Sequence, residues 1–364
     1  MSKKSPQLRF EGFTDDWEER KFADFIDVKS GKDYKHLNSG SIPVYGTGGY
    51  MLSVDRALSD IDAIGIGRKG TIDKPYLLKA PFWTVDTLFY AVPKQNIDLQ
   101  FSLSIFKKIN WKKFDESTGV PSLSKTVINS VGASVPSYEE QQKIGSFFKQ
   151  LDETIALHQR KLDLLKEQKK GYLQKMFPKN GAKVPELRFA GFADDWELRK
   201  SKELCTISTG KGNTQDKVDD GAYPFYVRSA TIEKSDEYLY DQEAVLTVGD
   251  GVGTGKVYHY VNGKYNLHQR VYRMYDFKDV SAKYFYYYFS NNFYKRVMSM
   301  TAKTSVDSVR MEMIADMNIV FPSVKEQENI VELFSNLDNT IALHQRKLDL
   351  LKEQKKGFLQ KMFV

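Results

Sequence analysis

A 24-residue segment occurs twice in this chain with a single difference. Residues 154–177 read TIALHQRKLDLLKEQKKGYLQKMF, and residues 340–363 repeat them except that Phe358 stands where the first copy has Tyr172. A packed core accepts many apolar residues of suitable size, so packing alone does not require such near-identity. The repeat therefore indicates a recent duplication or one surface used twice, and it constrains the fold before any local pattern does.

Each copy belongs to a longer duplicated half. Residues 6–21 (PQLRFEGFTDDWEERK) and 185–200 (PELRFAGFADDWELRK) match at twelve of sixteen positions. A period near 180 residues is too long for a solenoid, whose units span roughly 20–45 residues. We therefore expect two homologous domains, at residues 1–135 and 185–321. The repeated segments 136–177 and 322–364 follow them, and residues 178–184 form a linker.

The repeated segments are predicted to be long helices that form a coiled coil. Ser137 with Glu140, and Ser323 with Glu326, fit capping boxes at the two helix starts. Apolar residues then recur in steps of four and three, which indicates a heptad seam. The predicted seam residues are Phe148, Leu151, Ile155, Leu162, Leu165 and Tyr172 in the first copy, and Phe334, Leu337, Ile341, Leu348, Leu351 and Phe358 in the second.

Two histidines and two lysines interrupt this seam at His158, His344, Lys169 and Lys355. Register specification or snorkelling is the favoured explanation, and metal binding by the histidines is a lesser alternative. A connection of about ten residues leads from the first helix directly into the next domain, so we expect the helices to pair antiparallel. The expected fold is α/β: two mixed α/β domains separated by two long antiparallel helices that form a coiled coil, with pseudo-twofold symmetry.

The two domain sequences contain short β-rich runs. We expect strands at residues 42–45, 63–66, 87–92, 244–248, 257–261 and 271–274. Asn262-Gly263 after one of these runs predicts a hairpin. A helix is predicted near residues 281–300, with Tyr284, Tyr288 and Phe289 as core residues.

Both domains also contain a glycine-rich turn with cations. Residues 65–71 (GIGRKGT) match a dinucleotide-binding fingerprint, but Pro75 follows and no helical period appears. Residues 251–256 (GVGTGK) resemble a P-loop, but Asp250 replaces its first glycine and Val257 its magnesium-binding hydroxyl residue. An ordinary hairpin turn and a turn that suits phosphate or a groove edge remain as alternatives.

Composition narrows the function classes. The chain has 54 basic and 47 acidic residues, which permits nucleic-acid binding without requiring it. A single cysteine, Cys205, excludes a disulfide framework and a cysteine-based zinc finger. No signal peptide and no membrane-length apolar run is found, so we expect a cytoplasmic protein. Metalloprotease, serine-hydrolase and Walker motifs are absent, as is the adjacent-proline motif of amino-methyltransferases; a divergent carboxylate nuclease site stays open.

The arrangement resembles the specificity subunit of Type I restriction–modification systems over essentially the whole chain. The opening segments LRFEGFTDDWEERK and LRFAGFADDWELRK resemble the opening pattern of that family. The closing segments VPSYEEQQKIGSFFKQLDETI and FPSVKEQENIVELFSNLDNTI resemble its closing pattern. Their twofold occurrence around two divergent middles makes the resemblance specific.

The resemblance implies a mechanism. Each middle would be a target recognition domain that reads one half of a bipartite double-stranded DNA sequence, and the helices would fix the gap between the halves. Two methyltransferase subunits would dock on the helices, and restriction–translocation subunits would join them. This chain would be non-catalytic and would bind no cofactor, since its partners use S-adenosylmethionine, ATP and magnesium.

Polar turns supply the predicted DNA contacts. In the first domain these are Lys32, Tyr45, Thr47, Arg68, Lys69 and Lys125, and in the second they are Lys211, Tyr226, Arg228, Lys256, Gln269, Arg270 and Lys303. Arg228, Gln269 and Arg270 are favoured for base contacts, because arginine and glutamine can bind a guanine or adenine edge through two hydrogen bonds. Three alternatives remain: a self-contained nuclease or methyltransferase, a coiled-coil scaffold without a DNA role, and the specificity component of a related restriction system with other subunits.

Overall fold

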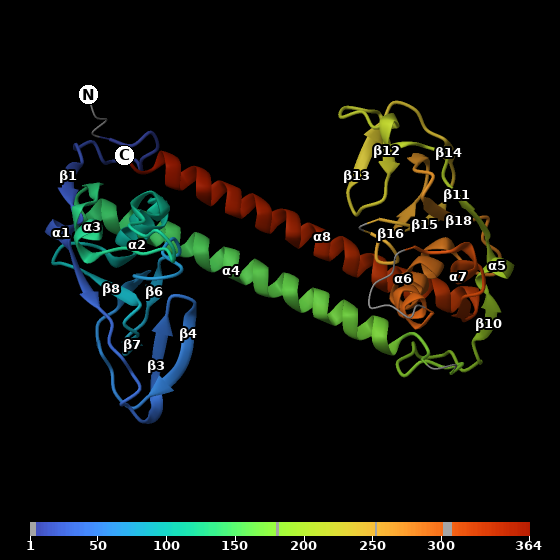
Figure 1. Ribbon diagram of the computed structural model, residues 1–364, viewed down its shortest axis with the longest axis horizontal. Coiled ribbons are helices and arrows are strands. Elements are labelled where there is room, and N and C mark those ends of the chain that lie inside the picture. Colours follow the sequence, from blue (N-terminus) through green and yellow to red (C-terminus); the bar gives the residue numbers. More distant parts are fainter. Residues whose placement is uncertain (1–4, 180–181, 252, 301–307) are drawn as a thin grey trace. The chain divides into compact units, whose positions relative to one another are not determined.

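Two compact units make up the computed structural model, which describes residues 5–179, 182–251, 253–300 and 308–364. Unit 1 holds the described residues up to Arg160 together with Gln345–Val364, and unit 2 holds Lys161–His344. Each unit therefore contains one globular domain, the adjoining part of one long helix and the far end of the other (Figure 1).

The domain of unit 1 consists of three small sheets with short helices. A four-stranded sheet has the order β2-β8-β5-β6, a three-stranded sheet the order β4-β3-β7, and β1 pairs with β9. All pairs are antiparallel except β3 with β7. The strands are β1 (Glu18–Lys21), β2 (Ile26–Ser30), β3 (Ser39–Gly46), β4 (Gly49–Val54), β5 (Ala63–Gly67), β6 (Tyr76–Leu78), β7 (Trp83–Thr84), β8 (Leu88–Pro93) and β9 (Gly132–Val135). The helices are α1 (Phe22–Phe25), α2 (Leu99–Lys108), the 3-10 turn η1 (Trp111–Phe114) and α3 (Lys125–Ser130).

The domain of unit 2 repeats this plan. Its sheets have the orders β11-β18-β15-β16, β13-β12-β17-β14 and β10-β19, and β12 with β17 is the parallel pair. The strands are β10 (Glu197–Lys200), β11 (Thr206–Thr209), β12 (Tyr223–Tyr226), β13 (Ile232–Ser235), β14 (Tyr240–Asp241), β15 (Ala244–Val248), β16 (Tyr258–Val261), β17 (Lys264–Leu267), β18 (Val271–Tyr275) and β19 (Asn318–Phe321). The helices are α5 (Ser201–Leu204), the 3-10 turn η2 (Thr214–Asp216), α6 (Ala282–Ser299) and α7 (Met311–Ala315).

All six predicted strands are confirmed, as is the predicted aromatic helix, α6, which starts after Ser281. The hairpin predicted from Asn262-Gly263 is wrong. Strand β16 pairs with β15, whereas β17 pairs with β12 and β14 in a different sheet. Gly263 has a φ of 110°, and this left-handed turn carries the chain from one sheet to the other instead of closing a hairpin.

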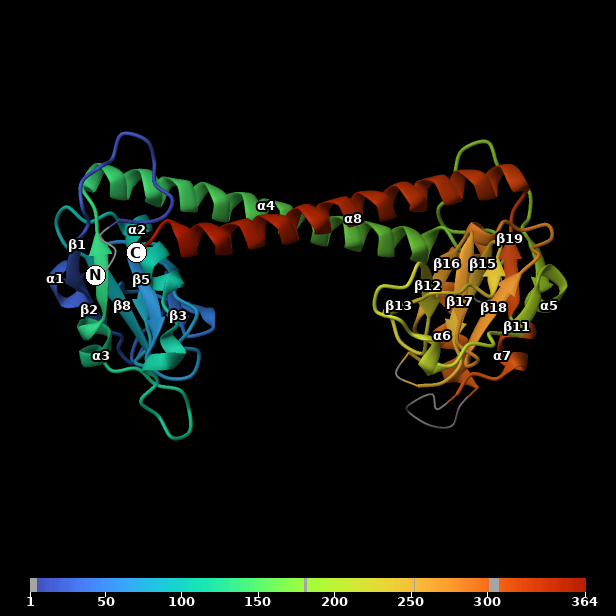
Figure 2. The same cartoon turned by 90° about the horizontal axis from the view of Figure 1, so that it is seen from above.

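The repeated segments form two helices of 38 residues each, α4 (Tyr138–Lys175) and α8 (Val324–Lys361), which pack together as predicted (Figure 2). Within each unit the two helices run antiparallel. In unit 1 Lys355 of α8 bonds Asp152 of α4, and in unit 2 Lys169 of α4 bonds Asp338 of α8 at 2.5 Å. The lysines that interrupt the heptad pattern therefore fix its register through ion pairs.

Each of these aspartates also receives a hydrogen bond from its own domain. Lys107 of α2 lies 2.7 Å from Asp152, and the Tyr287 hydroxyl of α6 donates to Asp338 at 2.9 Å. Burial raises the pKa of the Asp152 carboxyl, but the hydrogen bonds from Lys107 and Lys355 outweigh it and hold that pKa below its ordinary value. For the lysine the balance is reversed: burial, together with the charge of the neighbouring Lys107, lowers the pKa of Lys355 despite its bond to Asp152.

The predicted seam residues differ in their surroundings. Leu162, Leu165, Leu348 and Leu351 are buried, whereas Leu151, Ile155, Leu337 and Ile341 are half-buried. Phe148 and Phe334 are fully part of the domain cores, and Phe358 and Tyr172 pack against those cores from the side. The predicted residues therefore form a helix–helix seam in the middle of each helix, and near the helix ends they contact the domains.

The two residues that directly follow each long helix complete a domain core. Met362 and Phe363, which follow α8, belong to the core of unit 1, where Phe363 contacts Trp17 and Phe148. Met176 and Phe177, which follow α4, occupy the same place in the core of unit 2, where Phe177 stacks on Phe334. Matching backbone bonds accompany them, from Leu8 N–H to Lys361 O and from Leu187 N–H to Lys175 O, both at 2.9 Å.

The glutamates of the two predicted capping boxes bind arginines from the opening repeats. Arg9 donates to Glu140 through two nitrogens at 2.8 Å each, and Arg188 does the same to Glu326. Both glutamate side chains are 1% exposed. A bidentate guanidinium satisfies a buried carboxylate better than a single backbone N–H does, so the repeated L-R-F and E-Q motifs are two sides of one contact.

We expect Phe363→Ala to destabilise unit 1 by about 3 kcal/mol, because it removes a buried aromatic ring from a core. Hydrogen exchange should show loss of protection in the strands of the first domain and not in those of the second. Val364→Ala, at a residue 40% exposed, is the control, and Phe177→Ala should produce the mirror result in unit 2. Equal loss in both domains for Phe363→Ala would contradict this account of the cores.

Candidate nucleic-acid interface

Three of the predicted DNA-binding cations lie around one cavity of the first domain, which we call the first hollow. It has a volume of about 390 Å³ and lies where β5 ends, beside β8 and the start of α3. It is lined by Ser30, Arg68, Lys69, Phe89, Glu116, Ser122, Leu123, Ser124 and Lys125. Three cations face one carboxylate, and Glu116 is itself held by the Ser124 N–H at 2.9 Å. The hollow therefore suits an anion such as a DNA phosphate.

Backbone bonds hold the cations of the first hollow in place. The Arg68 N–H donates to Thr87 O at 2.8 Å, and the Arg68 carbonyl accepts from Leu123 N–H at 3.0 Å. The guanidinium lies 5.9 Å from the centre of the Phe89 ring, which supports it from one side. Arg68 and Lys69 are nevertheless exposed, so their charged groups can reach a ligand.

The second domain has a cavity of about 360 Å³, which we call the second hollow. It is lined by Thr209, Gly249, Asp250, Gln269, Arg270, Tyr272, Ser308, Val309, Arg310, Met311 and Glu312. Two arginines here face two carboxylates, so this hollow carries less positive charge than the first. Gln269 and Arg270, both predicted contacts, are side by side on the turn between β17 and β18.

Strand register shows that the two hollows are equivalent. Ser30 pairs with Phe89 in the first domain as Thr209 pairs with Tyr272 in the second, and all four residues line the hollows. Lys69 forms a bridge with Ser122, and Asp250 forms the same bridge with Ser308. The same place in the fold therefore holds a lysine in one domain and an aspartate in the other.

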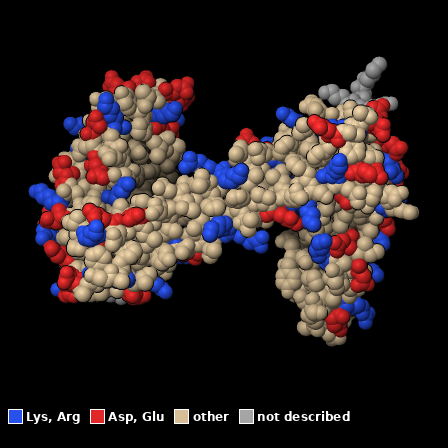
Figure 3. Space-filling model, turned by 180° about the vertical axis from the view of Figure 1, so that it is seen from behind, with Lys and Arg blue, Asp and Glu red and all other residues tan. Residues whose placement is uncertain are grey.

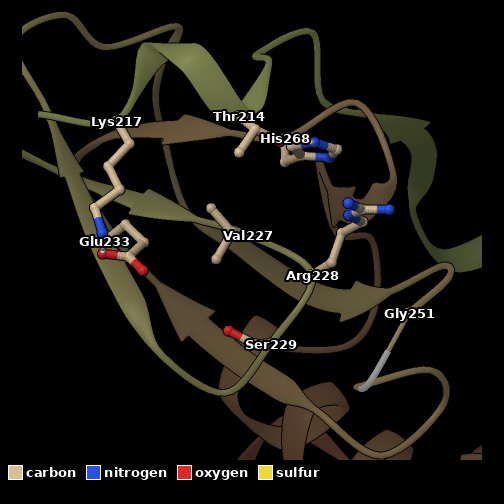
Figure 4. Close-up of a pocket in the computed structure, with 8 residues that line it drawn as sticks. All are labelled: Thr214, Lys217, Val227, Arg228, Ser229, Glu233, Gly251 and His268. Atoms are coloured by element: carbon tan, nitrogen blue, oxygen red, sulfur yellow. Dashed lines mark hydrogen bonds and ion pairs between the residues drawn. The ribbon is translucent and has the colours of Figure 1, made fainter.

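A third cavity lies beside the second hollow and holds the predicted contact Arg228 (Figure 4). This flanking hollow has a volume of about 330 Å³ and is lined by Thr214, Lys217, Val227, Arg228, Ser229, Glu233, Gly251 and His268. Figure 4 shows Arg228 and His268 on one side and the Lys217–Glu233 ion pair, at 3.1 Å, on the other.

His268 is a buried residue between these two cavities that binds the backbone of the Gln269-Arg270 turn. Its side chain is 5% exposed, and its Nδ1 accepts the Arg270 N–H at 3.0 Å. Burial, followed by the nearby Arg228 charge, lowers the pKa of His268, so the imidazole is neutral at pH 7. A neutral ring with an unprotonated Nδ1 can orient the backbone of the Gln269-Arg270 turn.

The remaining predicted contacts lie outside the hollows. Lys32 and Lys211 are exposed on the loops after β2 and β11, and Thr47 lies near Gly70 of the Arg68 loop. Tyr45 and Tyr226 pack among other rings in hydrophobic clusters. The Lys256 ammonium lies 5.1 Å from the Tyr294 ring. Lys303 lies outside the described residues.

Sequence reasoning missed the polar residues that only register brings to the hollows. In the sequence Asp250 only breaks the P-loop pattern, and His268, Ser308, Arg310 and Glu312 carry no local signal. Charge does not mark the interface either, since acidic and basic side chains intermingle over both domains on the face that Figure 3 shows. A comparison of the two halves strand by strand could have identified the Lys69–Asp250 equivalence.

The part of the chain that the structure describes supports neither a metal site nor a membrane-spanning helix. No cluster of three or more histidine, cysteine or carboxylate side chains there could hold a metal ion. Among the same residues, no helix is both long and apolar enough to cross a membrane.

A family model for the Type I restriction modification DNA specificity domain matches the chain twice, at residues 14–167 and 193–353. The chain belongs to this family. It is the DNA specificity subunit of a Type I restriction–modification system, with two target recognition domains and no catalytic activity of its own. The family predicted from the opening and closing repeats is thereby confirmed.

Relatives agree with this assignment. The MjaVIII specificity subunit of Methanocaldococcus jannaschii is 22% identical over 329 residues, which cover 83% of this chain and 75% of that protein. The EcoDI specificity subunit of Escherichia coli is 26% identical over 166 residues, or 46% of this chain and 36% of that protein. The crystal structure of a Type-I system S subunit from M. genitalium has the same fold, with a TM-score of 0.79, 13% identity and 99% of both chains covered.

Proposed function

We propose that each recognition domain contacts one half of a bipartite duplex DNA target through its equivalent hollow. The observation that carries this proposal is the convergence of predicted contacts on one place in both folds: Arg68, Lys69 and Lys125 in the first domain, and Gln269 and Arg270 in the second. A hollow used twice, with different side chains, suits two domains that read different half-sites.

The two domains divide the work differently. In the first, three cations beside one acid favour phosphate contacts, which position the protein on the duplex. In the second, Arg228, Gln269 and Arg270 are proposed to contact base edges in the major groove. Lys32, Tyr45, Thr47, Lys211, Tyr226, Lys256 and Lys303 stay predictions as DNA contacts.

The long helices are proposed as a spacer and as a dock for two methyltransferase subunits. Exposed leucines occur at equivalent places: Leu157 and Leu343 are 61% and 64% exposed, and Leu164 and Leu350 are 62% and 48% exposed. In unit 1 Leu157 lies five residues after Asp152 and Leu350 five before Lys355, so the ion pair places the two leucines at the same height along the helix pair. In unit 2 Leu343 and Leu164 have the same relation to Asp338 and Lys169. Two equivalent pairs of exposed leucines suit two copies of one partner.

Catalysis in this proposal belongs to the partners. The methyltransferase subunits would use S-adenosylmethionine, and restriction–translocation subunits would use ATP and magnesium. A complex that acts on cellular DNA would work in the cytoplasm, as the sequence predicted. A related system with other subunits remains the alternative, and it would differ in which subunits copurify with this chain.

Methylation sequencing of cells that express the chain with its methyltransferase should reveal one split motif with a fixed spacer. Exchange of residues 201–321 for those of another allele should alter one half of that motif, because each domain reads its own half-site. Alteration of both halves, or of neither, would contradict modular reading. A non-DNA scaffold would produce no motif at all.

Arg68→Ala should weaken DNA binding and reduce the slope of log affinity against log salt by about 0.9, because one phosphate contact is lost. The choice of bases should not change. The measurement is fluorescence anisotropy with the methyltransferase present, between low and moderate salt. Lys79→Ala is the control, since Lys79 is exposed, pairs with Asp62 and does not line the first hollow. An unchanged slope in folded Arg68→Ala protein would remove Arg68 from the interface.

The double variant Leu157→Ser, Leu350→Ser should reduce the methyltransferase copies in the complex from two to one. Both residues are exposed, so the free energy of unfolding should change by no more than about 0.5 kcal/mol. Native mass spectrometry counts the copies, and Leu343→Ser with Leu164→Ser should give the same count. Leu198→Ser, an exposed leucine on β10, is the control and should retain two. Two tightly bound copies in both double variants would show that the dock lies elsewhere.

A further inference from the structure

Asp250 lies in a glycine-rich loop that holds two arginines by their backbones. Among the described residues of this loop, 249–251 and 253–255, the Gly249 N–H donates to Arg270 O at 2.8 Å and the Gly253 N–H donates to Arg228 O at 3.3 Å. A side chain at Gly249 would collide with the Arg270 carbonyl, at 2.7 Å from the position of its Cβ. The loop therefore fixes the backbone positions of Arg228 and Arg270.

The Asp250 carboxylate lies between the two guanidiniums. Its Oδ1 is 3.7 Å from Nη1 of Arg228, and its Oδ2 is 3.6 Å from Nε of Arg270. Oδ1 is covered and receives no hydrogen bond from the residues that the structure describes. The contact between Oδ1 and Arg228 is therefore an ion pair without a hydrogen bond, and the carboxylate charge acts on both arginines.

The guanidiniums remain available to a ligand. The Arg228 and Arg270 side chains are 50% and 65% exposed, and they line the flanking hollow and the second hollow respectively. One acid therefore lies within ion-pair distance of one arginine on each of two neighbouring surfaces. An arginine with a fixed fork can pair with the O6 and N7 atoms of guanine, whereas an unconstrained one can turn to any phosphate.

The first domain contains no such arrangement at the equivalent place. Lys69 stands there, beside Arg68 and Lys125, and adds to the positive charge of the first hollow. An aspartate at this position lowers phosphate attraction, so it opposes general DNA binding. Oδ1 is also covered by protein, so this oxygen is not available for a direct contact to DNA.

We propose that Asp250 is a positioning residue that holds Arg228 and Arg270 in place to read guanines in the second half-site. This inference rests on the proposed function of the second domain as a DNA reader. It goes beyond that function by naming the base and the residue that sets selectivity. Asp250 exchanges some general affinity for discrimination, because it keeps two cations from binding phosphates at random.

The test is Asp250→Asn in the complex with the methyltransferase. Guanine preference at the positions read by Arg228 and Arg270 should fall roughly tenfold, while the first half of the motif stays the same. Affinity for unrelated duplex DNA should stay equal or rise, since a negative charge is lost. Methylation sequencing gives the motif, and competition binding with duplexes changed at one base gives the fold-change. A role in folding alone would not raise nonspecific binding while it lowers selectivity.

Two matched comparisons sharpen the test. Lys69→Gln, at the equivalent place in the first domain, should weaken binding to all sequences alike and leave the second half unchanged. In an Arg228→Ala background, Asp250→Asn should cause no further loss at the base that Arg228 reads, because a residue that acts through another adds nothing once that residue is gone.

An unchanged second half in both Asp250→Asn and Asp250→Glu would overturn the inference, and so would a second half without guanine in the unaltered protein. Equal loss at both halves, or equal loss of specific and nonspecific binding, would also overturn it by showing a general structural role. Failure of the proposed function is distinguishable, because the unaltered chain would then give no split motif.

Discussion

The two residues that follow each long helix make the contact on which the rest of this structure depends. Phe363 enters one domain core and Phe177 the other, and each packs on the phenylalanine at the equivalent start of the partner helix, Phe148 or Phe334. The chain segment that completes the first domain is thus separated from it by the whole second domain in sequence. The helices and the domains therefore cannot vary independently. The end of each helix packs in the core of one domain, and its start is continuous with the other domain.

This constraint applies equally to the two 24-residue copies. Each copy must supply a lysine that binds an aspartate, part of the helix seam and a Met-Phe pair. The Met-Phe pair completes the core of the domain that the other half of the chain encodes. Phe358 packs edge-on against Phe147, whereas the Tyr172 hydroxyl accepts a hydrogen bond from Gln168. The single difference between the copies therefore lies where a ring meets the edge of a domain core.

The sequence predicts the architecture well because duplication and heptad spacing are properties of the chain itself. Strands, the α6 helix and the helix pair follow from local pattern and repeat. The Asn262-Gly263 hairpin fails because a turn signal reports local geometry and not which sheet receives the next strand. The capping-box pattern does not predict the partners of Glu140 and Glu326, because Arg9 and Arg188 reach them from more than 130 residues away. Asp250 shows the same limit, since its importance comes from arginines that other loops bring to it.

A fixed helix pair also defines what a divergent recognition domain must conserve. Asp152 and Asp338 are the same residue of the repeat, but the first domain satisfies its aspartate with Lys107 and the second uses Tyr287 from another turn of the equivalent helix. The buried amides of Gln141 and Gln327, by contrast, bind the same two backbone groups in both units, the N–H at the start of α2 or α6 and a proline carbonyl. Backbone contacts of this kind are insensitive to the domain's side chains, and a hydrogen-bond donor to the aspartate can come from several positions. The domain surface that carries the hollows is therefore free to change from Lys69 to Asp250 without disturbing the helices that hold both domains.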